Sequence, residues 1–354
     1  MIIGAVMAGL VYVVIALIVK FAGVKWISKL MPAVVIGPTV AIIGLSLSGN
    51  AIGDAVGVAK DGSAFVMNAH AGVCLICALV TLAVTMLCSV FGKKMMKMIP
   101  FIIGIVSGYI VASIFTIIGN NTGIDALKII DYSAFSNLRW VPSFTFETAF
   151  SGGYDFGDAG SIASYIGTIA AAYVPVAFVV FAEHIADHKN ISTIIEHDLL
   201  EDPGLHRTLL GDGVGSMVGA FFGGCPNTTY GESVGCVAIT GNASVVTIFA
   251  TAILAIIISF FGPFVTFLST IPNCVMGGVC VTLYGFIAVS GLKMIQEVDL
   301  NDNRNLFVVA VILICGIGGL TVSFGKITIT SIACALILGI ITNIILGSKK
   351  NKAD

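Results

Sequence analysis

Long apolar runs almost free of charge recur along the chain, and they constrain its fold more than any other feature. Between Ala159 and Ala182, for example, no residue is charged. A helix needs about 20 mostly apolar residues to cross a bilayer. Charged residues make up only 10% of the chain, against about 25% in soluble domains. The sequence therefore predicts an all-α polytopic membrane protein.

Candidate membrane segments follow directly from these runs. They cover residues 2–19, 33–49, 70–91, 98–119, 166–188, 208–223, 229–240, 244–262, 273–291, 306–322 and 328–347. The segment 229–240 is too short to cross a bilayer alone.

Lysine and arginine are distributed unevenly between the two sides of this map. With the C-terminus in the cytoplasm, all but four of the 17 Lys and Arg residues fall on the cytoplasmic side. The four on the other side are Lys60, Lys128, Arg139 and Lys326. The positive-inside rule therefore predicts a multi-pass protein of the cell inner (cytoplasmic) membrane with a cytoplasmic C-terminus.

Two stretches of the chain resemble each other. "MPAVVIGP" at 31–38 resembles "IPNCVMGG" at 271–278, an offset of 240 residues (271 − 31). One apolar segment directly precedes each copy, 2–19 before the first and 244–262 before the second. Before 244–262 lie three further elements, 166–188, 208–223 and 229–240, and the same offset places their counterparts before residue 1. The second copy thus has seven elements and the first has four. Because seven is odd, two complete copies would be inverted in the membrane. We therefore expect an inverted-repeat (7+7 span) transporter fold with broken helices, here lacking about the first three spans; chance similarity between helices is the alternative.

An acidic, histidine-containing stretch closes the run that ends at Ala182. "AEHIADH" places Glu183, His184, Asp187 and His188 within six positions. Glu183 and Asp187 are four apart and share one helix face. Ionisable residues inside a span are costly and usually functional. The alternative is that the span ends at Ala182 and leaves Glu183 among the lipid headgroups, but the amphipathic "NISTII" that follows favours a longer helix.

Metal chemistry is a second reading of the same histidines. The order here is E-H-x-x-x-H, whereas zinc proteases use H-E-x-x-H with the glutamate between the histidines. Cys74 and Cys77 formally make a CxxC pair, but small packed thiols are common in membranes. The pattern therefore predicts no metal site.

A second polar stretch, "FFGGCPNTTYGESVG", interrupts the apolar run that follows. Its glycines and Pro226 break the preceding helix, residues 226–229 are extended, and a short helix begins near Tyr230. Broken helices in membranes line cavities, and half-helix N-termini hold polar substrates. Glu232 lies in the first turn of the short helix, where a capping box with Thr229 is its structural alternative.

The two polar stretches together suggest a ligand of a particular shape. Two carboxylates facing a cavity can accept N–H groups from a small planar ring, while backbone N–H groups at the half-helix start donate to its carbonyls. Proton coupling would need a carboxylate or histidine in a titratable environment.

Four motifs, "AEHIADH", "EDPGLHRTLLGDG", "PNTTYGESVG" and "IPNCVMGG", together resemble the nucleobase/ascorbate transporter family, the uracil and xanthine permeases. The form "NTTYGE" is most similar to the uracil-permease branch. The resemblance implies a nucleobase:cation symporter that is not an enzyme and imports a nucleobase, uracil first, with a proton. Sodium coupling, a xanthine or purine substrate, an intramembrane metal-binding enzyme and a non-transporting fragment are the alternatives.

The resemblance also implies partners and site residues. The partners are the nucleobase, membrane lipid and a second copy in a homodimer, without nucleic acid and without a cofactor other than the coupling proton. The implied substrate-binding residues are Glu183, Tyr230, Gly231 and Glu232. The candidates for proton coupling are Glu183, His184 and Asp187. Some relatives carry a histidine at the place of Asp187, which leaves the proton-carrying group open.

A core domain and a gate domain are implied as well. The core would comprise residues 1–22 and 166–262, the gate residues 23–119 and 263–348, with an extracellular loop at 120–165 and a cytoplasmic tail at 349–354.

Overall fold

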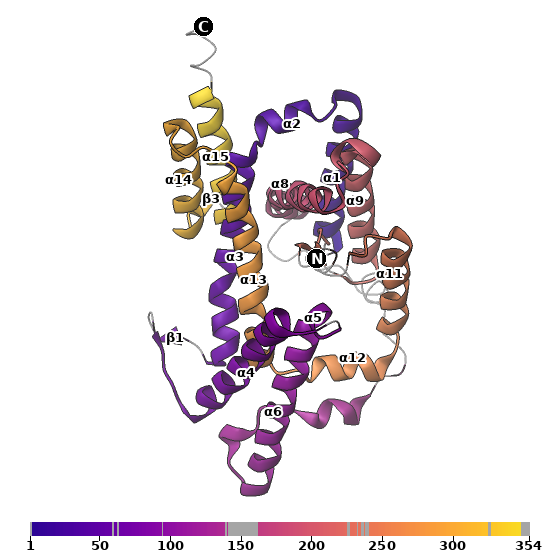
Figure 1. The fold of residues 1–354 in the computed structure, drawn as a ribbon, viewed down its shortest axis with the longest axis vertical. Coiled ribbons are helices and arrows are strands. Elements are labelled where there is room, and N and C mark those ends of the chain that lie inside the picture. Colours follow the sequence, from indigo (N-terminus) through magenta and orange to yellow (C-terminus); the bar gives the residue numbers. More distant parts are fainter. Residues whose placement is uncertain are drawn as a thin grey trace. The chain divides into compact units, whose positions relative to one another are not determined.

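A computed structural model of the chain describes residues 2–58, 60–61, 64–93, 95–138, 140, 162–224, 227–231, 233–234, 237, 241–324 and 327–347. Most of these residues are helical (Figure 1). The longer helices are α1 (Ile2–Ala22), α3 (Ala33–Val56), α4 (Ala69–Phe91), α6 (Pro100–Thr122), α8 (Ile162–Ile195), α9 (Leu205–Phe221), α11 (Val245–Ser259), α13 (Asn273–Gln296), α14 (Asn303–Ile317) and α15 (Ser331–Gly347). Short elements are α2 (Lys25–Leu30), α5 (Met95–Met98), η1 (Asp125–Leu127), η2 (Tyr132–Asn137), η4 (Leu200–Gly204) and α12 (Gly262–Ser269), and two hairpins, β1 (Lys60–Asp61) with β2 (Ala64–Phe65) and β3 (Val322–Phe324) with β4 (Ile327–Ile329).

Every long helix corresponds to a predicted apolar segment. Six helices among the described residues are long and apolar enough to cross a bilayer, and a seventh span results if α11 and α12, bent by 87°, count as one. The prediction of an all-α polytopic membrane protein is confirmed. The inverted repeat and the core and gate domains stay predictions.

Helix boundaries follow local sequence signals. Asn68 caps α4, since its side-chain oxygen accepts the Ala71 N–H at 2.8 Å. Pro100 occupies the first turn of α6, where its missing N–H costs nothing. Gly123 ends the same helix in the left-handed conformation, at φ 73°. Gly223, at φ 95°, follows the end of α9, where the glycines of the stretch "FFGGCP" predict a break in the helix.

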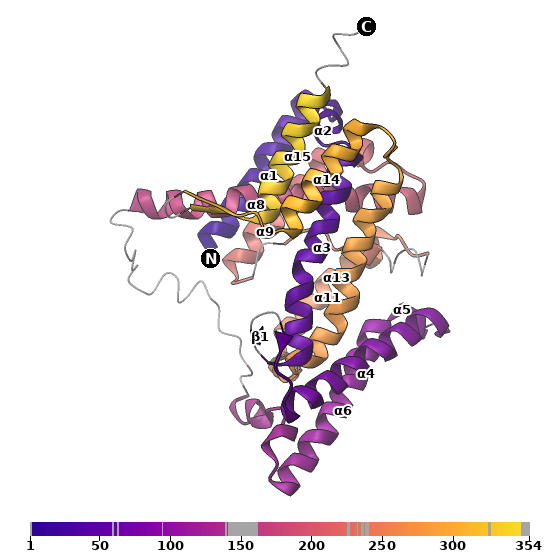
Figure 2. The same cartoon turned by 90° about the vertical axis from the view of Figure 1, so that its left-hand side faces the viewer.

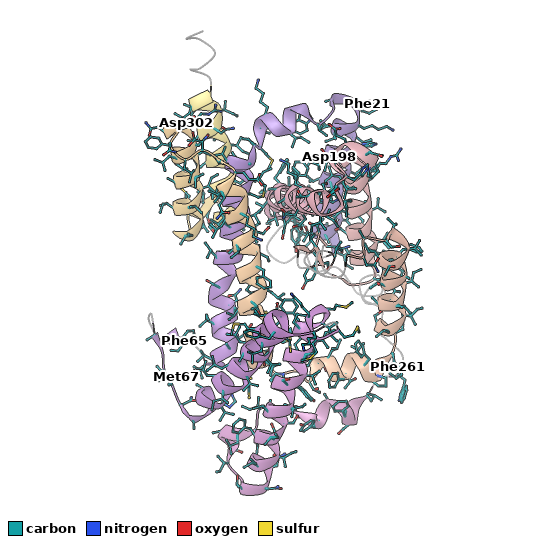
Figure 3. The ribbon with its side chains drawn as sticks, viewed as in Figure 1. Phe21, Phe65, Met67, Asp198, Phe261 and Asp302 are labelled. Carbon is teal, nitrogen blue, oxygen red and sulfur yellow. The ribbon has the colours of Figure 1, made fainter. Side chains whose placement is uncertain are left out.

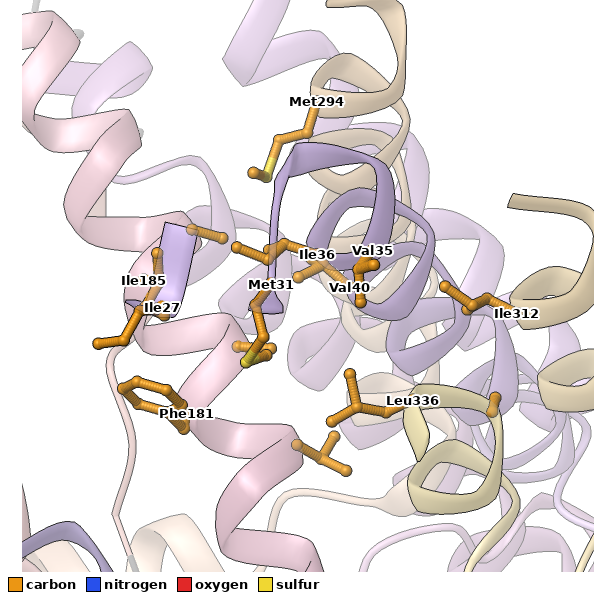
Figure 4. Close-up of a cluster of buried hydrophobic side chains, with 14 of the residues drawn as sticks. Ile27, Met31, Val35, Ile36, Val40, Phe181, Ile185, Met294, Ile312 and Leu336 are labelled. Atoms are coloured by element: carbon orange, nitrogen blue, oxygen red, sulfur yellow. The ribbon is translucent and has the colours of Figure 1, made fainter. Parts of the chain in front are cut away.

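The chain forms two compact units. The first comprises Met1–Ser46, Ser143–Val234 and Ile287–Asp354, and the second Leu47–Pro142 and Gly235–Phe286. In the first unit a buried apolar cluster joins α2, α3, α8 and α15, through side chains such as Ile27, Ile36, Phe181 and Leu336 (Figure 4). This cluster holds the middle of α8, the helix with the acidic residues, in place.

The second unit is built on α4 and α6, which lie side by side (Figures 1 and 2). Gly104 and Gly108 of α6 face the Thr85 and Thr81 side chains of α4, which would clash with any Cβ at either glycine. Small residues at the interface let the two helix backbones approach closely, as is typical of membrane helices.

Large apolar side chains cover much of the surface. Phe21, Met67 and Phe261, labelled in Figure 3, are all exposed. In α11 the structure leaves no residue buried. Such a surface suits lipid rather than water.

Candidate functional site

The acidic stretch lies inside α8 and not beyond its end. The helix continues to Ile195, as the polar continuation "NISTII" predicts. His184 is only 1% exposed and Asp187 7%. The helix therefore continues beyond Ala182 with both side chains buried, and the depth of Glu183 in the bilayer stays a prediction.

His184 is held by two partners on α9. Its Nδ1 lies 3.0 Å from Asp212 Oδ2, and its Nε2 lies 3.0 Å from Thr208 Oγ1. The Thr208 hydroxyl is also 3.0 Å from the carbonyl of Leu205 in its own helix. The two contacts on α9 therefore fix the orientation of the His184 ring.

His188 extends this network by one turn. Its Nδ1 donates to the carbonyl oxygen of His184 at 2.8 Å, and the two rings stack with centroids 4.2 Å apart. The Tyr12 ring of α1 meets the other side of His184 edge-on, at 6.0 Å between centroids. Polar side chains of α1, α8 and α9 therefore meet in the interior of the first unit.

Asp187 points to the broken segment that follows α9. The Thr229 hydroxyl donates to Asp187 Oδ2 at 2.5 Å. A Cβ placed on Gly231 would lie 3.0 Å from Asp187 Oδ1, so the backbone of Gly231 passes close to the carboxylate. The two polar stretches singled out in the sequence are thus in direct contact.

The broken segment is itself anchored on α9. Residues 227–230 form no regular structure, and the helix resumes at Gly231, as predicted. The Ser216 hydroxyl accepts the Asn227 N–H at 3.0 Å and lies 3.1 Å from the Asn227 carbonyl oxygen. Gly215 and Gly219 of α9 lie beside the Asn227 side-chain amide, and a Cβ at either position would be in van der Waals contact with it, at 3.4 Å. Backbone polar groups of a non-helical segment need such partners inside a membrane.

A cavity of about 180 Å³ lies between α1, α8, α9 and the broken segment. Its walls include Tyr12, Tyr173, Ser216 and Asn227. The volume is smaller than the roughly 300–1,000 Å³ of drug-sized sites, so the cavity suits a small ligand.

Glu183 lies on the stripe of α8 that faces this cavity. Ala172, Val176 and Val180 line the cavity at intervals of four, and Glu183 follows three residues later, so all share one helix face. Tyr12 lies within electrostatic range of the Glu183 and Asp212 carboxylates. Its hydroxyl lies near Thr228 but meets no partner at good hydrogen-bond geometry among the described residues.

The other implied substrate residues have different outcomes. Tyr230 is 58% exposed and directly precedes the resumed helix. Glu232 lies outside the described residues, so its predicted place in the first turn stays a prediction. Among the residues that the structure describes, no group of three or more His, Cys, Asp or Glu side chains is arranged to hold a metal ion.

Four residues that build this site, Tyr12, Thr208, Asp212 and Ser216, had no role predicted from the sequence. Thr208 and Asp212 lie in the motif "LHRTLLGDG", and Asp212 is the sole charged residue of α9 after Arg207. Tyr12 is the one polar aromatic in its uncharged span, and Ser216 sits among glycines. An isolated polar residue in an apolar span is a signal that could have marked Tyr12 and Asp212.

Comparison with known proteins gives the family. The Permease family profile (Xan_ur_permease) matches residues 1–324. The uracil permease of Bacillus caldolyticus is 39% identical over 357 residues, which cover 99% of this chain and 76% of the relative. The uracil permeases of Bacillus subtilis and Escherichia coli K12 are 37% and 35% identical and are covered to 77% and 72% of their length. The chain belongs to this permease family and is a multi-pass membrane transporter rather than an enzyme.

Proposed function

We propose that this permease imports a nucleobase, uracil first, by proton symport across the cytoplasmic membrane. One structural observation carries the proposal: the acid-bearing face of α8 contacts the broken segment at Thr229 and Gly231. The three relatives compared above are all uracil permeases, which supports uracil over a purine.

The chemistry of the site matches a small planar ring that has N–H donors and carbonyl acceptors. The Glu183 carboxylate would accept a ring N–H, and Glu232 would accept another. The first turn of the resumed helix offers the Gly231 N–H to a ring carbonyl, because the first N–H groups of a helix have no partner within it. Tyr12 lines the same cavity, and its hydroxyl would be a further donor if it turned toward the ligand.

Proton coupling would use the titratable groups already in contact there. Asp187 is tied to the substrate-side segment through Thr229, and His184 is tied to α9 through Asp212. Protonation of either group changes which hydrogen bonds hold the broken segment and α9 to α8. The coupling ion would therefore bias the shape of the substrate site itself.

The finer features of the fold belong to the same proposal. They are two inverted repeats of seven spans, a homodimer in lipid and a cytoplasmic C-terminus. The starts of α3 and α13 support the repeat: each directly follows a proline and has a glycine at its fifth position, Gly37 or Gly277, and the two lie 240 residues apart (273 − 33).

Uptake of radiolabelled uracil at pH 5.5 and pH 7.5 tests the function. The chain is expressed in the form that its gene encodes, in cells that lack their own uracil permease. Faster uptake at pH 5.5, abolished by a protonophore, is expected. Uptake of xanthine but not uracil would contradict the substrate, sodium-dependent uptake without a pH effect would contradict the coupling, and no uptake of any base would contradict transport.

A further inference from the structure

A hydrogen bond joins the acid-bearing helix α8 to α13 beyond the candidate site. The Asn190 side-chain amide donates from Nδ2 to Ser290 Oγ at 3.1 Å. Both side chains are partly buried, and both residues belong to the first unit. The bond therefore ties α8 to a helix that lies 100 residues further along the chain.

Asn190 lies on the same face of α8 as the two acids. Glu183, Asp187 and Asn190 occupy positions i, i+4 and i+7 of one helix, and this spacing aligns them along a single stripe. Asn190 comes seven residues (190 − 183), or about two turns, after Glu183. The hydrogen bond to Ser290 thus lies across the continuation of the acid-bearing face.

Two lysines indicate which side of the membrane this hydrogen bond faces. Lys189 directly precedes Asn190, and Lys293 follows Ser290 by three residues (293 − 290); both lysine side chains are exposed. The positive-inside rule assigns lysines at the end of a span to the cytoplasmic side. A nucleobase that left the site along the acid-bearing face toward the cytoplasm would therefore have to pass this contact.

Ser290 belongs to a helix that α3 holds in place. A Cβ on the next residue, Gly291, would collide with the backbone nitrogen of Ala41, and a Cβ on Gly37 would lie 3.1 Å from the Gly291 carbonyl oxygen. Glycines at both positions bring the α3 and α13 backbones into close contact. The Ser290 hydroxyl is therefore positioned by α3 and α13 and not by α8.

Apolar side chains pack beside the hydrogen bond. Phe181 and Ile185 of α8 and Met294 of α13 are at most 6% exposed and belong to one buried cluster (Figure 4). Apolar contacts are non-directional, whereas a hydrogen bond requires a particular distance and angle between its two groups. The Asn190–Ser290 bond therefore defines one placement of α8 against α13 more narrowly than the apolar cluster does.

We propose that Asn190 and Ser290 form a latch that keeps the cytoplasmic end of α8 against α13 while the site is loaded and that must open for the nucleobase to leave. This role rests on the proposed transport function. Asn190 is a positioning residue, since it acts through the placement of α8 and does not touch the substrate. A neutral amide–hydroxyl pair suits a reversible contact, because water can replace either partner when the helices part.

A reversible cross-link at the latch tests whether it must open. Asn190→Cys and Ser290→Cys are combined in the otherwise wild-type full chain and bridged with a short bifunctional methanethiosulfonate. Trypsin cleaves after Lys189, Arg207 and Lys293, so mass spectrometry should show peptide 190–207, which has no native cysteine, joined to peptide 208–293. Uracil uptake should fall roughly tenfold or more in the linked chain and return with dithiothreitol, while the purified linked chain still binds uracil.

The single cysteine variants, treated with the same reagent, are the controls for reaction at native thiols and should keep their uptake. Normal uptake by a chain that is fully linked would overturn the latch and leave the transport function in place. Loss of uracil binding in the linked chain would also overturn it, because a latch outside the site leaves binding intact. No uptake of any nucleobase by the wild type would instead contradict the proposed function, and the latch with it.

Ser290 variants separate the latch from a general loss of stability. Ser290→Ala removes the acceptor and lowers the population of the latched state that receives uracil, so KM should rise roughly fivefold with an unchanged maximal rate. Ser290→Thr keeps a hydroxyl and should restore the wild-type KM. The matched control is Thr193→Ala, which should leave KM unchanged, because the Thr193 hydroxyl donates to the Lys189 carbonyl oxygen of its own helix at 3.0 Å.

A double-mutant cycle tests whether the two residues act through one contact. Asn190→Ala with Ser290→Ala should raise KM no further than either change alone, because the first change already removes the bond. Additive increases in KM, or an unchanged KM in Ser290→Ala, would contradict the latch.

Discussion

Two sets of buried polar groups, one in each unit, are satisfied in opposite ways. In the first unit, His184, Asp187 and Thr229 bond across elements, from α8 to α9 and to the broken segment. In the second unit, Thr81 and Thr85 donate to carbonyls of their own helix four residues earlier, at 2.9 and 2.8 Å. The first arrangement depends on how separate elements are placed, and the second does not.

This difference separates a region whose buried hydrogen bonds join elements from a region whose threonine hydroxyls bond within one helix. A hydroxyl that bonds within its own helix stays satisfied when the helix moves. A carboxylate that bonds to another element loses its partner when that element shifts, and an unpaired buried charge is costly. Substrate or proton binding can therefore act on the first unit through a few named hydrogen bonds.

Replacement of Glu183 should have the largest effect on transport. Glu183→Gln keeps the size of the side chain but replaces a charged acceptor, whose hydrogen bond is worth about 1.5–3 kcal/mol, so uracil uptake should fall roughly 100-fold. Glu196→Gln, at the exposed end of the same helix region, is the matched control and should transport normally. Normal uptake by Glu183→Gln in the presence of normal membrane levels would remove Glu183 from the site.

Replacement of Asp212 should destabilise the first unit. Asp212→Ala leaves the buried His184 Nδ1 without its acceptor, at a cost of about 1–3 kcal/mol, whereas Asp212→Asn keeps an acceptor oxygen and should cost less. Thermal unfolding in detergent with both variants measures the difference. Equal melting temperatures for Asp212→Ala and wild type would show that the contact contributes nothing.

The sequence predicted the helices well because bilayer crossing depends on composition alone. Each long helix lies on an apolar run, and the break after α9 follows from Gly223 and its neighbours. Glu183 and Asp187 were also singled out from sequence, since an acid within an apolar run is costly, and their roles stay predictions. No knowledge of tertiary structure is required for either inference.

The partners of these residues could not be predicted in the same way. His184 and Asp212 are 28 residues apart, and Asp187 and Thr229 are 42 apart, on separate elements. Their contact depends on the rotation of α9 against α8, which the apolar pattern does not fix.

Close helix packing can be tested with two glycines of α13. Gly291 lies against the backbone of Ala41 and Gly37 in α3, so Gly291→Ala should cost about 1–3 kcal/mol of stability through overpacking. Gly285 on the same helix has open space, and Gly285→Ala should stabilise the helix by up to about 1 kcal/mol. Melting temperatures that move in opposite directions are expected. A rise in both would mean that the close approach at Gly291 is not tight, and a fall in both would mean that Gly285 does not have open space.

Replacement of a threonine by valine at two positions, one in each unit, tests the contrast between hydrogen bonds across elements and hydrogen bonds within one helix. Thr229→Val removes the cross-element donor to Asp187 and leaves a carboxylate oxygen unpaired, which should cost about 1–2 kcal/mol and lower uracil uptake roughly tenfold. Thr81→Val removes a hydroxyl that bonds only to Cys77 of its own helix, whose carbonyl keeps its helical partner, so the change should stay within about 0.5 kcal/mol. Uptake and thermal unfolding of both variants measure the pair under the same conditions. A Thr81→Val effect as large as that of Thr229→Val would show that the hydroxyl in the second unit also joins separate helices, and the contrast between the two units would not hold.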